Sequence, residues 1–153
     1  MSVLGLKVLL LNPPNFNSRY INRDLMGGLG VSILKRHQLT ERLMSSLKAK
    51  SIRLPVISLV YTATLLAKEH DVSIVDAANL NLNTQETLQK IEKLNPQWII
   101  STTSIASLFE EVKFLSQLKK RLNVMTVLLG DAATFFFKKN SGRILRRLHR
   151  ERG

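Results

Sequence analysis

Apolar residues in this chain fall into short continuous runs separated by stretches with helical spacing. The runs are too short for helices and too uniformly apolar for half-exposed strands, so they are typical of strands buried on both faces. They span residues 6–11, 72–75, 98–100 and 124–129. Apolar residues three and four apart predict three helices, within 56–67, 84–94 and 108–122. Strands that alternate with helices imply right-handed crossovers and a parallel sheet covered on both faces.

We therefore expect a flavodoxin-like (Rossmann-like) α/β domain. It would be a three-layer sandwich around a parallel sheet of about four strands, in the spatial order 2-1-3-4. The domain would cover residues 1–137, with a basic insertion at 13–53, and a basic tail would follow at 138–153.

Two pairs of residues mark the starts of predicted helices. Asn83 with Glu86, and Ser107 with Glu110, have the spacing of capping boxes. The helix that follows Ser107 should turn five apolar side chains toward the core: Leu108, Val112, Leu115, Leu118 and Leu122.

Composition limits the chemistry. The chain has no cysteine, which excludes disulfides, thiolate zinc sites and cysteine-held clusters within these residues. No apolar run approaches the ~18 residues of a membrane span. We expect a cytoplasmic protein without a membrane span.

The net charge of +12 comes from two regions, because residues 19–53 and 138–153 each carry +6. In the tail, Arg143, Arg146, Arg147 and Arg150 share one helical face. The tail is a basic arm for nucleic acid or anionic lipid, a solvated end, or the product of a truncated or shifted reading frame. The third interpretation is favoured, because composition changes abruptly near Phe136.

The carboxyl ends of the strands are the expected site, since ligands bind there where strand order reverses. The first strand ends in NPPN at 12–15, the third in STTSIAS at 101–107, and the fourth in GDAAT at 130–134. Paired prolines end a strand in any case, so Pro13 and Pro14 favour a rim and a plain strand end about equally. The hydroxyl cluster is more informative, because capping explains Ser107 but not the hydroxyls from Ser101 to Ser104.

No catalytic residue and no protein metal ligand is predicted. None of the three histidines, His37, His70 and His149, falls in a strand-end loop, and His70 is most simply a residue at a helix end. Asp76 and Asp131 both end strands but lack an evident acid–base partner. Asp76 is expected to cap a turn or touch the edge of a ligand.

Four stretches carry a family resemblance. KVLLLNPP (7–14), LPVISLVYTATLLAKEHDVSIVDA (54–77), NPQWIISTTS (95–104) and VLLGDAATFF (127–136) are similar, in this order, to the N-terminal cobalamin-binding domain of the radical S-adenosylmethionine enzyme superfamily. The wider corrinoid-binding fold has a Ser-x-Leu or Ser-x-Thr element and later a Gly-Gly element. Here Ser101-Thr102-Thr103 is followed by 26 residues and then Gly130-Asp131.

The resemblance implies a corrin ring lying across the strand ends, with three distant turns meeting along one rim and shaping a slot. The nucleotide tail would insert between the first and third strands. The residues implied to bind cobalamin are Asn12, Pro13, Pro14, Ser101, Thr102, Thr103, Gly130 and Asp131.

Two departures from the family pattern change the expectation. The loop NPPNFN at 12–17 has no histidine, so cobalamin would be held without a protein histidine below the cobalt. Asp131 replaces the second glycine of Gly-Gly, so a carboxylate would face the nucleotide or the ring amides.

The same resemblance implies partners. Relatives continue into a fifth strand and then a barrel bearing three cysteines, so we expect an incomplete fifth strand here and no turnover by this chain alone. A radical S-adenosylmethionine domain or subunit is the implied partner. The fourth strand would be an apolar sheet edge that the tail covers or that favours self-association. The alternatives are a basic nucleic-acid-binding module and a flavodoxin-like interaction module without a cofactor.

Overall fold

The computed structural model describes residues 5–16, 20–23, 31–33, 56–130 and 132–134. Its main sheet has four parallel strands: β1 (Lys7–Asn12), β4 (Asp71–Asp76), β5 (Trp98–Thr102) and β6 (Met125–Leu129). Their order is β4-β1-β5-β6, which is the predicted order 2-1-3-4. The flavodoxin-like prediction is therefore confirmed for the described part of the chain.

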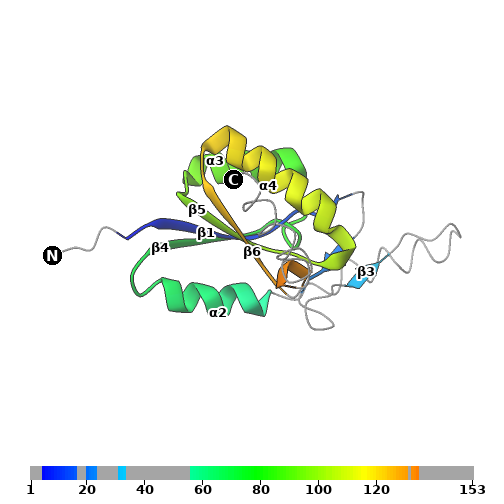
Figure 1. Ribbon diagram of the computed structural model, residues 1–153, viewed down its shortest axis with the longest axis horizontal. Helices are drawn as coiled ribbons and strands as arrows, with labels where there is room; N and C mark the ends of the chain where they lie inside the picture. The colour runs from blue at the N-terminus through cyan, green and yellow to red at the C-terminus, as the bar shows by residue number, and fades with distance from the viewer. Residues whose placement is uncertain (1–4, 17–19, 24–30, 34–55, 131, 135–153) are drawn as a thin grey trace, which may run out of the picture.

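Helices cover both faces of this sheet (Figure 1). α2 (Ile57–Leu66) lies on one face. α3 (Thr84–Leu94) and α4 (Leu108–Leu122) lie on the other, and the short 3-10 turn η2 (Ile105–Ser107) leads into α4. A sandwich of three layers results, with β1 at its centre.

Two apolar clusters fill the spaces between the layers. Leu9 and Leu11 of β1 pack toward α3 and α4, together with Ile99. Val8 and Leu10 point the other way and pack with Leu59 of α2. This division explains why β1 is apolar at consecutive positions, since successive side chains of a strand point to opposite faces. β1 ends at Asn12, immediately before the two prolines.

One predicted helix start is confirmed and one is wrong. Asn83 and Glu86 form the capping box, with Glu86 N donating to Asn83 Oδ1 at 2.9 Å and Asn83 N donating to Glu86 Oε2 at 2.8 Å. Ser107 makes no cap bond at α4, so the predicted box with Glu110 does not form. The Ser107 hydroxyl instead donates to Glu111, one turn further along the helix.

The predicted inward face of α4 also needs correction. Val112 is 43% exposed, whereas Phe114 and Glu111 are buried. The inward stripe is therefore turned slightly from the predicted one, and it includes a carboxylate. Phe114 packs edge-on against Phe16, which follows β1.

The insertion at 13–53 contains an unpredicted antiparallel pair, β2 (Tyr20–Asn22) with β3 (Val31–Ile33). Strands of three residues are too short to give a periodic signal. The tail at 138–153, the predicted reading-frame boundary near Phe136 and residue Asp131 lie outside the described residues.

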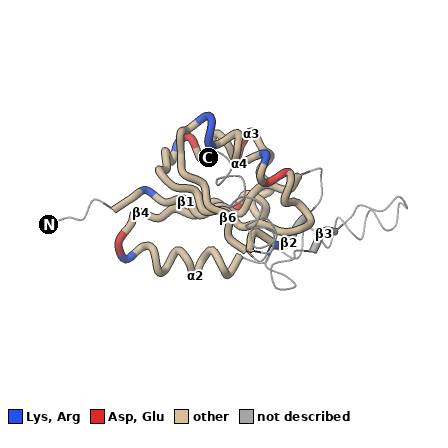
Figure 2. The backbone as a smooth tube through the Cα atoms, in the orientation of Figure 1, with Lys and Arg blue, Asp and Glu red and all other residues tan. Residues whose placement is uncertain are grey.

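Charge is unevenly placed around this fold (Figure 2). α2 carries no charged residue along its length, whereas α3 and α4 carry both signs. Four large apolar side chains of α2 are exposed: Ile57, Val60, Tyr61 and Leu65. α2 is therefore apolar on its outer side as well as on the side that packs against the sheet.

Candidate functional site

The turns after β1, β5 and β6 lie side by side at the carboxyl ends of the strands. Parallel pairing sets Leu11 beside Ser101 and Thr102 beside Leu129. The Thr102 hydroxyl is 3.4 Å from Asn12 Oδ1, and Thr103 N donates to Leu129 O at 3.0 Å. We call this edge the rim. The described residues therefore bring the three predicted turns together.

The predicted site residues on the rim are largely buried. Asn12 and Thr102 are each 3% exposed, Thr103 is 1% exposed, and Ser101 is fully buried. Pro13 and Pro14 are also buried, and Gly130 is partly exposed. The hydroxyl cluster thus points into the protein, where its partners are other groups of the same chain.

A buried ion pair lies at the centre of the rim. Arg23 Nε donates to Glu111 Oε1 at 2.6 Å, and both side chains are fully shielded from solvent. Arg23 also donates through Nη1 to Asn12 Oδ1 at 2.9 Å and through Nη2 to Pro14 O at 3.2 Å. One guanidinium therefore joins the end of β1 to the first turn of α4.

The Glu111 carboxylate is surrounded by donors. Oε1 accepts from Arg23 and from the Ser107 hydroxyl, and Oε2 accepts from the Thr103 hydroxyl and from Ser104 N at 3.2 Å. Four donors match the four acceptor sites of an ionised carboxylate. Ser104 and Ser107 also share a hydrogen bond between their hydroxyls, at 2.9 Å. These bonds account for the hydroxyl-rich sequence after β5.

Asp76 extends the network to the end of β4. Its Oδ1 accepts from Asn12 Nδ2 at 2.7 Å, and its two oxygens accept from Asn79 N at 3.1 Å and Asn79 Nδ2 at 2.6 Å. Asp76 therefore caps the turn after its strand, as predicted. Asn12 connects Asp76 to Arg23, because its amide donates to the first and accepts from the second.

Gly130 closes the rim at the end of β6. Its φ of +133° lies in a region that side chains strongly disfavour. A Cβ at this position would lie 3.1 Å from Thr103 O. The glycine therefore lets the backbone approach Thr103, and this contact within the protein explains it without a ligand.

The residues predicted to line a slot between β1 and β5 are buried and bonded to other groups of the protein. The Arg23 guanidinium contacts Asn12 at the end of β1 and Glu111 in the first turn of α4. Ser101 makes a local contact, from its hydroxyl to Thr102 O at 3.2 Å. A ligand tail that enters between these strands has to displace Arg23.

Sequence reasoning missed Arg23 and Glu111. Glu111 had a signal, because it stands three residues after Leu108 and four before Leu115, on the predicted inward face of the helix. A lone carboxylate on such a face needs a buried partner. Arg23 had no comparable signal, since it lies in a segment without periodicity.

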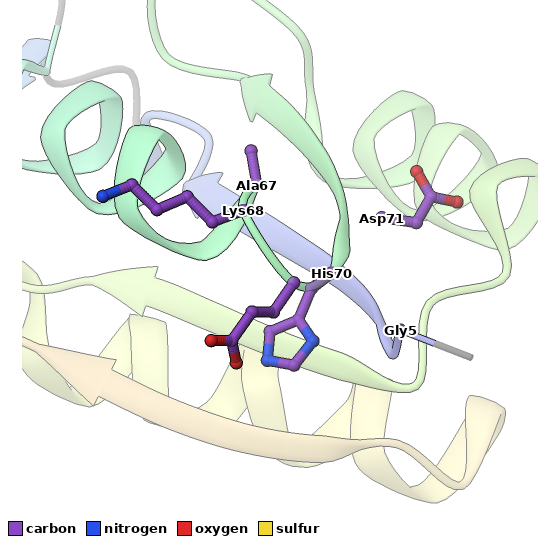
Figure 3. Close-up of a pocket in the computed structure, with 6 residues that line it drawn as sticks. Gly5, Ala67, Lys68, His70 and Asp71 are labelled. Carbon is purple, nitrogen blue, oxygen red and sulfur yellow. The ribbon is translucent and has the colours of Figure 1, made fainter. Parts of the chain in front are cut away.

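A hollow of about 460 Å³ lies at the opposite end of the sheet, before β1 and β4 (Figure 3). Its lining includes Gly5, Lys68, His70 and Asp71, and the side chains of His70 and Asp71 point in different directions. The buried Nδ1 of His70 has no hydrogen-bond partner among the described residues. The polar groups of this hollow do not converge on a common point, so it offers no assembled site.

Over the described ranges, no group of three or more His, Asp or Glu residues is arranged to hold a metal ion. Within the same residues, every helix is too short or too polar to cross a membrane. No protein-family model, curated protein or solved structure matches the chain. Function must therefore be argued from the rim itself.

Proposed function

We propose that this chain is a corrinoid-binding domain that holds cobalamin across the carboxyl ends of β1, β5 and β6. The observation that supports it best is the meeting of three distant turns on one rim, through the contacts of Thr102 with Asn12 and of Thr103 with Leu129. The rim lies where strand order reverses, which is where open α/β sheets bind ligands.

The chemistry of the rim suits a ligand with many primary amides. Oxygen acceptors of Asn12, Pro14 and Glu111 come together at this edge, and a ligand reaches them once the Arg23 side chain, which occupies them, moves away. A corrin ring carries amide side chains that donate N–H groups to such acceptors. No histidine occurs among the rim residues that the structure describes, so we propose that cobalamin is held there without a protein ligand below the metal.

The ring and the nucleotide tail make different demands on this rim. A ring laid on its outer surface requires no change in the buried network. A tail inserted between β1 and β5 requires the Arg23 side chain to leave its position. Asn12, Pro13, Pro14, Thr102 and Thr103 would then line the exposed opening, with Ser101 and Gly130 beside it.

Bound cobalamin would supply methyl-transfer or carbon-skeleton chemistry, and only with a radical S-adenosylmethionine domain or subunit as partner. The chain by itself is expected to bind the cofactor without turnover.

Gel filtration of the protein with hydroxocobalamin, which is red, tests the proposal. Purified protein mixed with hydroxocobalamin should elute from gel filtration as a red protein peak. A colourless protein peak would overturn the proposal. Two alternatives would then remain: a cofactor-free flavodoxin-like module and a basic nucleic-acid-binding module. Salt-sensitive binding to a polyanion would indicate the second of these.

A pair of matched variants locates the binding. Ala106 is exposed in the 3-10 turn at the rim, and Ala67 is exposed at the far end of the sheet. Ala106→Trp should weaken cobalamin retention on the order of tenfold by obstructing the rim, equivalent to about 1.4 kcal/mol. Ala67→Trp should retain cobalamin like the unmodified chain. Equal retention by both variants would place binding elsewhere. Bulky changes at Ser101 or Thr103 are less informative, because these side chains are buried and the fold itself would be disturbed.

A further inference from the structure

Three acceptors around the Arg23 guanidinium form what we call the Arg23 seat: Glu111 Oε1, Asn12 Oδ1 and Pro14 O. Each nitrogen of the guanidinium donates to one of them. We propose that this seat is a binding site for planar N–H donors, namely guanidinium and primary amide groups. Arg23 is its resident occupant, and an amide group of the corrinoid is the ligand that displaces it. This inference rests on the proposed function and assigns a residue-level step to it.

The position of the pair argues for an exchangeable occupant. Arginine is almost never fully buried unless it is paired, and an apolar pair of similar volume often stabilises a core as well or better. This charged pair stands at the topological switch point, between the ends of β1 and α4, where the fold places ligands. The ion pair of Arg121 with Glu92 differs from it in burial. Its two atoms are also 2.6 Å apart, but both side chains are partly open to solvent.

The seat can also hold a neutral amide. When Arg23 leaves, Glu111 keeps three donors from its own chain: the hydroxyls of Thr103 and Ser107 and the backbone N–H of Ser104. An incoming primary amide supplies two N–H groups, which serve two of the three oxygens that Arg23 vacates. The carboxylate therefore stays hydrogen-bonded during the exchange, but it loses its counter-charge, and the contacts that the corrinoid makes have to offset that loss.

Chemical modification of arginine follows the exchange in the unmodified chain. Phenylglyoxal reacts with exposed guanidinium groups, and mass spectrometry reports each arginine separately. Arg23, which is fully shielded, should react slowly, and Arg121, whose side chain is 51% exposed, should react fast as the internal reference. Hydroxocobalamin should speed the reaction at Arg23 on the order of tenfold while leaving Arg121 unchanged.

The outcomes separate this inference from the proposed function. If cobalamin is retained and the reaction at Arg23 does not accelerate, the ligand does not displace Arg23 and the inference is wrong, while the proposed function stands. If cobalamin is not retained, the proposed function fails, and the seat is then tested without cobalamin.

That test uses Arg23→Ala, which empties the seat. Millimolar guanidinium chloride should raise the melting temperature of this variant above its value in sodium chloride of equal concentration. Arg121→Ala should gain nothing from guanidinium, because its pair is already open to solvent. If Arg23→Ala does not fold alone, recovery of folded protein on refolding with guanidinium, but not with sodium, supports the seat. No difference between the two salts in either format would overturn it.

Discussion

Arg23 Nε and Glu111 Oε1 lie 2.6 Å apart with both side chains fully buried, although 88 residues separate them in the sequence. The arginine follows β2 in the insertion, and the glutamate stands in the first turn of α4. This pair therefore attaches the insertion to the carboxyl end of the sheet, and its energetics are directly testable.

Removing one partner should destabilise the fold strongly. Arg23→Met leaves the Glu111 carboxylate buried without its counter-charge, which we expect to lower the free energy of unfolding by about 3–5 kcal/mol. The double variant Arg23→Met, Glu111→Gln removes both charges and should recover much of the loss. Urea denaturation with a common slope measures both effects.

Arg121→Met is the matched control, because it breaks an exposed pair of the same length. It should change the free energy of unfolding by less than about 1 kcal/mol. An equal loss in Arg23→Met and Arg121→Met would mean that burial does not matter to this pair.

Gly130→Ala should destabilise the rim. The backbone at this residue has a φ of +133°, and the added Cβ would meet Thr103 O at 3.1 Å. Strain of this kind costs on the order of 1–3 kcal/mol. Thermal denaturation measures the loss, and Thr134→Ala serves as a control, because Thr134 is exposed and its hydroxyl donates to the carbonyl of the same glycine. A Gly130→Ala variant as stable as the control would show that the turn adapts without strain.

The sheet could be predicted from the sequence because its strands are buried on both faces. Leu9 and Leu10 pack on opposite sides of β1, so the strand is apolar at four consecutive positions, 8–11, and stands out from its surroundings. Right-handed crossovers then predicted a parallel sheet, and the flavodoxin-like topology supplied the strand order and with it the location of the rim. These inferences depend on local pattern and on rules that hold for most α/β folds.

The interior of the rim could not be predicted in the same way. Part of the hydroxyl cluster serves a group further along the chain, because the hydroxyls of Thr103 and Ser107 both donate to the Glu111 carboxylate. Which cation pairs with the Glu111 carboxylate depends on the path of the insertion at 13–53, and the sequence of that segment has no periodicity that would predict it. A hydroxyl cluster suits a ligand and a buried ion pair equally well, and only tertiary structure distinguishes them.

The capping box of α3 makes a separate prediction about local stability. Asn83 and Glu86 exchange two hydrogen bonds at the start of the helix. Asn83→Ala should cost about 0.5–2 kcal/mol, because it leaves a helix N–H without its acceptor. Gln85→Ala, at an exposed position in the same turn, should be neutral or slightly stabilising, since alanine has the higher helix propensity. Urea denaturation of the two variants distinguishes the cap from general helix propensity.

The free edge of β6 predicts self-association. Among the described strands β6 pairs only with β5, and its Met125 and Val127 are 52% and 39% exposed. Its sequence, MTVLL, has no charge to repel a second copy. The opposite edge strand, β4, begins and ends with aspartates, which antiparallel pairing of two copies would bring together. We therefore expect two copies to join through β6, in a concentration-dependent way that sedimentation velocity detects.

Val127→Lys should reduce this association, because a lysine on an exposed edge strand opposes pairing with another chain. Ile74→Lys is the matched control, since Ile74 is 46% exposed on β4 and should leave association unchanged. A monomer at every concentration would contradict the prediction, and so would a loss of association in Ile74→Lys alone. In the second case β4 would be the edge that pairs, despite its aspartates.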